Sequence, residues 1–212
     1  MEAYEGLLSQ VEGFIKRFYI NRLIRGAFVF VGVSTLVFLI FVNLEYFGAF
    51  SSLVRGVLFF SLLLTILVLL WFYIVDPILK ISSLGRRMSP VDAAVLIGKL
   101  LPEVDDKVLN TIQLQSLNNT TNSELLNAAI KQKAQKLSSF SFGAAIDFKE
   151  NRRYLKFVVP VMLVFVSILL FNPQIIEQGS TRIVNYQQEF LIPAPFNFNL
   201  VSESESREEG TD

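Results

Sequence analysis

Three long runs of hydrophobic residues without a charge dominate the pattern along the chain. The charged residues that bound them are Arg25 and Glu45, Arg55 and Asp76, and Lys156 and Glu177. A helix needs about 20 mainly apolar residues to cross the roughly 30 Å hydrocarbon core of a bilayer, and each run is long enough. The pattern therefore predicts a transmembrane hairpin over 26–76, with spans of about 26–44 and 56–75, and a third transmembrane helix over 157–176.

Residues 1–25 repeat an apolar position every three or four residues, which is the pattern of an amphipathic helix. The apolar positions include Leu7, Val11, Phe14 and Phe18. Two placements fit this stripe. The helix lies at the membrane interface and turns into the first span, or it packs against other helices on the same side of the membrane. Both placements can hold together, and the pattern leaves them open.

Residues 77–156 carry the signals of a small helical insert between the second and third spans. A helix is predicted to start with Ser89 as its N-cap, Pro90 at its first position and Asp92 in its first turn, and to run to about Leu101. Further signals predict a turn at Asn118 and Asn119, a helix over about 123–137 and an N-cap at Asp147 before the third span.

An acidic stretch in this insert admits two interpretations. Pro102 predicts the start of another helix, with Glu103, Asp105 and Asp106 crowded into its first turn, where carboxylates interact favourably with the helix dipole. A divalent cation site is the alternative, but Asp105 and Asp106 are sequence neighbours that point to different faces, and the glycine-bearing loop of an EF-hand is missing. The helix-start interpretation is therefore preferred.

The basic residues near the ends of the spans predict the orientation in the membrane. They are Lys16, Arg17, Arg22 and Arg25 before the first span, Lys80, Arg86 and Arg87 after the second, and Lys149, Arg152, Arg153 and Lys156 before the third. The loop over 43–52 has none, and the chain after the third run has two, Arg182 and Arg207. We therefore expect a multi-pass protein of the bacterial inner membrane with a cytoplasmic N-terminus and insert and a periplasmic C-terminus.

Composition narrows the chemistry that the chain can perform. It has no cysteine and no histidine, so thiolate nucleophiles, Cys/His metal sites and imidazole bases are excluded. Nineteen Lys and Arg balance nineteen Asp and Glu, which gives no indication of a nucleic-acid partner. A glycine-rich phosphate loop is also missing, since "SSLGRR" has a single glycine. These features predict a protein that is not an enzyme and has no cofactor or metal.

The tail, 177–212, differs in composition from the spans. Its "PAPFNFNL" alternates apolar and polar residues after a proline-bounded turn, which predicts the start of a β-strand. A lone strand is not stable, so its partner strands come from another chain or from a continuation into a β-sandwich domain, or the tail is disordered. The expected fold class is thus an all-α membrane protein with three transmembrane helices, a small helical cytoplasmic insert and a short β-prone or disordered outer tail.

The layout and one motif resemble the N-terminal membrane region of a family of large bacterial envelope proteins, common in Bacteroidota and known as domain of unknown function 4175. The motif is an aliphatic–Pro–Glu, acidic–Asp–basic, Leu-Asn-Thr-Ile/Leu-Gln-Leu run. In this chain it falls on Leu101, Pro102, Glu103, Asp105, Asp106, Lys107, Leu109, Asn110, Thr111, Ile112, Gln113 and Leu114. The resemblance implies a long periplasmic continuation with β-sandwich-like modules, so this chain would be the N-terminal part of a longer protein. It implies no activity.

The function expected from these features is a non-enzymatic anchor or scaffold in the inner membrane. Its helical insert would dock a protein partner of unknown identity, and its tail would project an envelope domain. An accessory subunit of a transporter or of a secretion or envelope complex is the alternative; a transporter normally has ionisable residues within its spans, and these spans have none. The expected partners are the lipid bilayer and a protein; association of several copies of the chain is left open. Candidate docking residues are Glu103, Asp105, Asp106, Lys107, Asn110 and Gln113.

Overall fold

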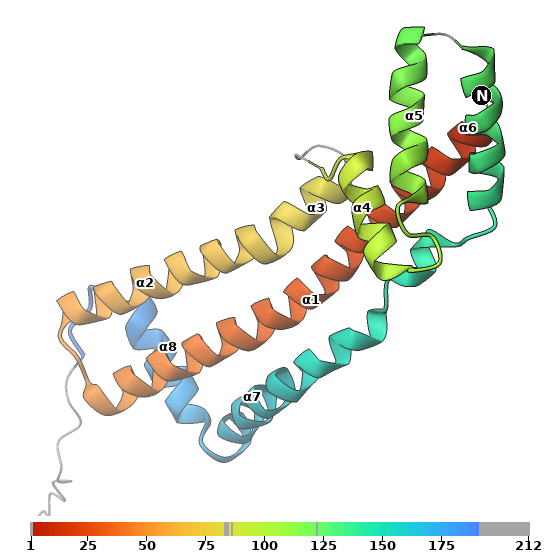
Figure 1. Cartoon of the computed structure of the whole chain (residues 1–212). Helices are drawn as coiled ribbons and strands as arrows, with labels where there is room; N and C mark the ends of the chain where they lie inside the picture. The colour runs from red at the N-terminus through yellow and green to blue at the C-terminus, as the bar shows by residue number, and fades with distance from the viewer. Residues whose placement is uncertain (1, 83–84, 86, 122, 191–212) are drawn as a thin grey trace, which may run out of the picture.

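A computed structural model of the chain describes residues 2–82, 85, 87–121 and 123–190. Over these residues the structure is helical and has no β-strand (Figure 1). Three of its helices are long and apolar enough to cross a membrane. They are α1 (Glu2–Gly48), the continuous helix formed by α2 (Ser52–Leu70), the π-helical turn η1 (Trp71–Val75) and α3 (Asp76–Ile81), and the helix that ends with α7 (Arg152–Phe171). The prediction of three helices able to span a membrane is confirmed, but the third ends at Phe171 and does not extend to 176.

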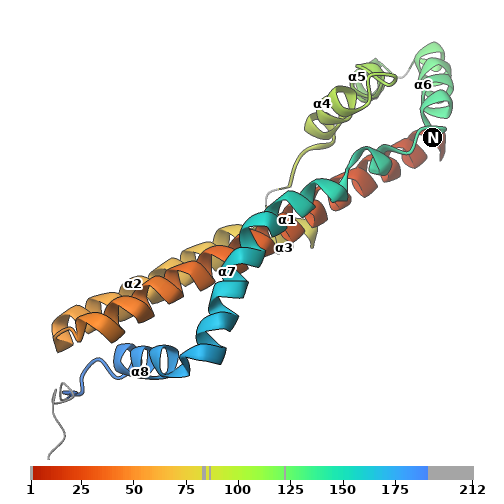
Figure 2. The ribbon, with the colours of Figure 1, turned by 90° about the horizontal axis from the view of Figure 1, so that it is seen from below.

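Helix α1 is the central element of the molecule. Its 47 residues form one helix, about 70 Å long at 1.5 Å per residue, which runs straight from one end of the molecule to the other (Figure 2). Within the described residues, α2 and α7 each contact α1 but do not contact each other, so the three spans form a row with α1 in the middle. Of the two placements left open for residues 1–25, a turn at the membrane surface does not occur, because no break separates them from the first span.

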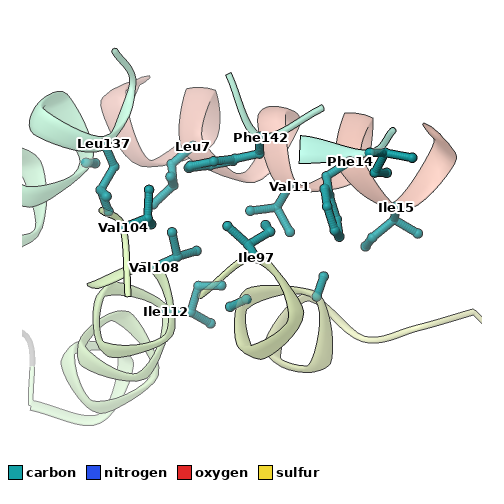
Figure 3. Close-up of a cluster of buried hydrophobic side chains, with 14 of the residues drawn as sticks. Leu7, Val11, Phe14, Ile15, Ile97, Val104, Val108, Ile112, Leu137 and Phe142 are labelled. Carbon is teal, nitrogen blue, oxygen red and sulfur yellow. The ribbon is translucent and has the colours of Figure 1, made fainter. Parts of the chain in front are cut away.

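The N-terminal part of α1 packs against the helices of the insert. These are α4 (Pro90–Leu100), α5 (Lys107–Thr121), α6 (Glu124–Leu137) and the short 3-10 helix η2 (Phe142–Ala145). Figure 3 shows Leu7, Val11 and Phe14 of α1 pointing toward Ile97 of α4 and Val108 of α5. All five side chains are fully buried. We call this unit the head, and its core shows that the amphipathic stripe serves protein packing.

Local sequence signals explain where several helices of the head begin. The Ser89 hydroxyl accepts a hydrogen bond from the Asp92 amide (3.1 Å) and donates one to the Asp92 carboxylate (2.7 Å), which fixes the start of α4 as predicted. Asp147 accepts from the Lys149 amide at 2.7 Å and caps the 3-10 turn η3 (Phe148–Asn151) that leads into α7. The predicted helix over 123–137 is α6, which Ser123 precedes.

The turn between α4 and α5 differs from the prediction. Helix α5 begins at Lys107, because 102–106 form a tight turn in which Asp105 has a positive φ of 46°. Glu103, Asp105 and Asp106 all precede the helix, so the prediction that Pro102 starts it and that these three acids lie in its first turn is wrong. The turn passes so close to α4 that a Cβ added at Gly98 would lie 2.6 Å from the Asp105 carbonyl oxygen, so this contact requires glycine.

Asn118 is helical, although the sequence predicted a turn there. It lies in the last turn of α5, and so does Asn119. The buried Asn118 side chain donates to the Asn127 Oδ1 at 2.7 Å and accepts from the Ser123 amide at 3.1 Å. Its amide therefore holds the start of α6 against the end of α5.

A further helix occupies the start of the predicted tail. α8 (Pro173–Val184) follows Asn172, which changes the chain direction after α7. It packs on α1, α2 and α7 at the end of the spans far from the head, which we call the hairpin end because the α1–α2 loop lies there. Gly179 and Ile183 are its buried residues. The prediction of a β-prone or disordered tail is therefore wrong for 177–184, and the predicted strand over 193–200 lies outside the described residues.

Candidate functional site

The predicted docking residues lie in the turn before α5 and on the exposed side of this helix. The other side of α5 packs into the head core, where Val108, Thr111 and Ile112 are buried. Val104 from the preceding turn is buried there too. The 3.6-residue period of the helix separates these positions from Asn110 and Gln113. All six predicted residues are exposed, namely Glu103, Asp105, Asp106, Lys107, Asn110 and Gln113. They lie in one short segment, the turn 102–106 and the first two turns of α5, and we call their exposed side chains the α5 face.

Backbone contacts fix the geometry of this face. The Lys107 ammonium donates to the Glu103 carbonyl oxygen at 2.8 Å, and the buried Thr111 hydroxyl donates to the Lys107 carbonyl oxygen at 2.7 Å. The ion pairs among the described residues involve other carboxylates, those of Glu45, Asp76 and Glu150. The acidic side chains of the α5 face are therefore exposed, and they form no ion pair with a basic side chain of the described residues.

The chemistry available to the α5 face is recognition at a surface. No group of three or more acidic side chains among the described residues lies close enough together to hold a metal ion. Asp105 and Asp106 also adopt different backbone conformations, since only Asp105 has a positive φ. Exposed carboxylates, an ammonium group and two amides can form charged and neutral hydrogen bonds with a partner surface.

A buried ion pair at the hairpin end was missed by the sequence analysis, which used both residues only as limits of the hydrophobic runs. Glu45, at the end of α1, is 0 % exposed, and Arg55, in the first turn of α2, is 5 % exposed. Their Oε1 and Nε atoms lie 3.6 Å apart. A charge at each end of a loop that joins two spans is the signal that could have predicted this pair.

Arg55 also binds the chain that follows α8. Its Nε donates to the Phe50 carbonyl oxygen at 2.9 Å, and its Nη1 donates to the Gln188 carbonyl oxygen at 2.9 Å. The Phe190 ring lies 5.0 Å from the Arg55 guanidinium carbon, within the range of a cation–π interaction. Arg55 therefore joins the α1–α2 loop to residues 188–190.

Tyr186 makes a second connection at the same end. The Ser52 hydroxyl donates to the Tyr186 carbonyl oxygen at 2.7 Å, and the Tyr186 ring packs on Phe59 and Phe60, with centroid distances of 5.6 and 5.7 Å. Together with Glu45 and Arg55 these contacts form what we call the hairpin lock. The lock fixes where the chain leaves α8 relative to the first two spans.

Comparisons with known proteins supply no relative from which a role could be transferred. No protein-family model, no curated protein and no solved structure matches the chain. The resemblance of residues 101–114 to the envelope family therefore stays a prediction. The roles of the α5 face and of the hairpin lock are argued from their geometry.

Proposed function

We propose that the protein is a non-enzymatic membrane anchor whose head docks a protein partner through the α5 face. The observation that carries the proposal is that the buried and exposed residues of this segment differ in kind. The apolar side of α5 is buried in the head core. The exposed residues are polar or charged, namely Glu103, Asp105, Asp106, Lys107, Asn110 and Gln113. An exposed acidic and amide-bearing surface that no interaction within the head requires is suited to a partner with a basic or amide-rich surface.

The proposed orientation places the head in the cytoplasm and the hairpin lock in the periplasm of a bacterial inner membrane. Support comes from the basic residues at the head end of the spans, such as Arg22, Arg25, Arg152 and Lys156, all of which are exposed. Cytoplasmic loops carry an excess of Lys and Arg beside the ends of transmembrane helices. The chain beyond Phe190 then continues from the hairpin lock into the periplasm, where the envelope-family resemblance would place a further domain.

The continuity of α1 gives the anchor a defined mechanical role. One helix carries Phe14 in the head core and Glu45 in the hairpin lock, so neither site can rotate about the helix axis without the other. A partner docked on the α5 face would be held at a fixed position relative to the membrane. We therefore propose a scaffold that couples a cytoplasmic partner to a periplasmic segment.

Photocrosslinking in cells tests the docking role. A photoreactive residue replaces Gln113, and the matched control carries the same residue at Gln132, which is exposed on α6. We expect Gln113 to give a defined protein adduct that Gln132 does not give. Adducts with lipid only, or the same protein adducts from both positions, would contradict docking at the α5 face.

An accessory subunit of a transporter or of a secretion or envelope complex is the second candidate. It is favoured by the exposure of the two outer spans. Within α2 the buried residue is Arg55, and α7 has no buried residue. A partner helix could cover Leu64, which is 63 % exposed on α2. A photoreactive residue at Leu64 distinguishes the two, because an anchor surrounded by lipid gives lipid adducts there and a subunit of a larger complex gives a protein adduct.

A further inference from the structure

A cavity of about 630 Å³ lies beside α1 at the head end of the spans. Its walls come from all three spans, with Arg22 and Arg25 of α1, Phe72 and Tyr73 of η1 and Tyr154 of α7. The cavity can form because α2 and α7 flank α1 without contacting each other within the described residues. With Phe18 of α1, two arginines and four aromatic residues therefore line one space at the level where the basic residues gather.

The π-helical turn shapes one wall of this cavity. Its five residues, Trp71–Val75, interrupt the α-helical hydrogen bonds of the second span, and the Asp76 amide donates to the Trp71 carbonyl oxygen. The Tyr73 carbonyl lies so close to Gly26 that no side chain could replace the glycine hydrogen. Single π-helical turns are frequent at functional sites. The close approach at Gly26 holds Phe72 and Tyr73 in the cavity wall.

A second, wholly apolar cavity of about 240 Å³ continues the first one toward the middle of the spans. The two cavities share Val29 and Tyr154, and the second is lined further by Val33, Leu36 and Phe157. On α1 the spacing of Arg22, Arg25, Val29, Val33 and Leu36 follows one face of the helix. The result is a groove with a cationic end at the membrane surface and an apolar end within the membrane.

The groove is open to the surrounding membrane. Helix α8 lies on another side of α1. Gly179 of α8 approaches Val42, and Phe38 lines a cavity together with α8 residues, and both positions fall opposite Val29 by the helical period. Arg22 and Arg25 are exposed, and no carboxylate of the described residues forms an ion pair with either. A ligand with an anionic head and an apolar chain would match both ends of the groove.

We propose that this groove is a binding site for an anionic glycerophospholipid. The phosphate lies between Arg22 and Arg25, and one acyl chain follows the apolar face of α1 beside Phe157. Basic pockets between transmembrane helices are suited to anionic lipid head groups on the cytoplasmic side. The aromatic rings of Tyr73 and Tyr154 suit the head-group level of a bilayer. The proposal is independent of partner docking, so the two can fail separately.

Trp71 provides the probe for this site. It is the single tryptophan of the chain, is 56 % exposed and precedes Phe72 of the cavity wall. The full chain is placed in phosphatidylcholine vesicles that contain a small fraction of a brominated lipid. In one sample the brominated lipid is phosphatidylglycerol, and in the other it is phosphatidylcholine. Brominated acyl chains quench tryptophan fluorescence at short range. We expect brominated phosphatidylglycerol to quench Trp71 more strongly, with a relative association constant about five-fold higher for each arginine engaged.

Matched variants assign the preference to the cavity. The double variant Arg22→Gln/Arg25→Gln should quench equally with both brominated lipids, whereas Arg22→Lys/Arg25→Lys should keep a preference for the anionic lipid. The control Arg152→Gln/Lys156→Gln removes the same charge from exposed positions at the same end of the spans, outside the cavity, and should keep the full preference. Equal quenching in the unaltered chain, or the same loss in the control, would overturn the proposal.

Inorganic phosphate distinguishes a phospholipid site from a site for a free anion. Phosphate added at the ionic strength of a chloride control should leave the excess quenching by brominated phosphatidylglycerol unchanged, because the apolar end of the groove contributes to binding. Removal of the excess quenching by phosphate but not by chloride would show a site for a free anion and overturn the phospholipid assignment.

Discussion

At the scale of single residues, Glu45 and Arg55 have the environment that constrains the chain most. Both side chains are nearly inaccessible, and the two oxygens of the Glu45 carboxylate accept no hydrogen bond from the described residues. Arg55, in contrast, has carbonyl oxygens from two segments as acceptors. Arg55 is therefore the only group of the described hairpin end that both offsets the Glu45 charge at close range and holds residue 188 in place.

Removal of the Arg55 guanidinium should loosen the hairpin end. Arg55→Met removes the guanidinium that lies against the buried Glu45 carboxylate, and breaking a buried pair in this way typically costs about 3 kcal/mol or more. We expect a lower unfolding temperature for the full chain in detergent and faster proteolysis within 185–190. Glu45→Leu/Arg55→Met should recover part of the loss, because no charge then stays unpaired. In the exposed pair of Glu150 and Arg153, Arg153→Met should have little effect. Equal effects of the two single changes would show that the hairpin lock is not stabilising.

At the scale of elements, the N-terminal part of α1 belongs to the head as much as to the first span. Phe14 is fully buried among residues of the head core, while Glu12, two residues earlier, is exposed. A large side chain in this position contributes both transfer free energy and the filling of a space that its neighbours cannot close. The head therefore depends on a helix that it shares with the membrane-spanning part of the chain.

Phe14→Ala should destabilise the head while leaving the spans in place. Phenylalanine-to-alanine changes in a core typically cost about 3–5 kcal/mol, because they create a cavity. Protease sensitivity of the α5–α6 connection, measured on the full chain in detergent, should rise sharply. Glu12→Ala is the matched control and should change it little. Unchanged protease sensitivity in Phe14→Ala would mean that the stripe of α1 contacts the bilayer and not the head.

The elements differ in how far the sequence predicts them, for physical reasons. The spans follow from uncharged runs, and α4 follows from the local cap at Ser89. The sequence could not decide whether the apolar stripe of α1 contacts lipid or protein, because the same apolar periodicity suits both surroundings. The turn at Asp105 depends on the close approach to Gly98, which is a tertiary contact. Helix α8 is short, and its packing on α1 is likewise a tertiary contact.

The same distinction applies to the candidate site. Exposure of the α5 face was predictable, because Asn110 and Gln113 fall between the apolar positions of an amphipathic helix. The ion pair of Glu45 with Arg55 and the hydrogen bond from Arg55 to Gln188 were not predictable, because they depend on where the chain returns after α8. Long-range returns of this kind leave no periodic signal in the sequence.

At the scale of the whole molecule, the row of three spans separates a head at one end from a lock at the other. The proposed scaffold requires that these ends lie on opposite sides of a membrane and that a partner covers the α5 face. The chain has no cysteine, so a single introduced cysteine reports the accessibility of one position without background. Ser51, Gln113 and Gln132 are exposed positions for this purpose, at the hairpin end, on the α5 face and on α6.

Labelling of these cysteines with a membrane-impermeant maleimide tests the central claim most directly. In cells with a permeabilised outer membrane, Ser51→Cys should react, whereas Gln113→Cys and Gln132→Cys should stay unlabelled. In native membranes opened by lysis, Gln132→Cys should react while Gln113→Cys stays protected by its partner, and both should react after purification. Labelling of Gln113→Cys in intact cells would contradict the orientation, and equal labelling of Gln113→Cys and Gln132→Cys in lysed native membranes would contradict docking at the α5 face.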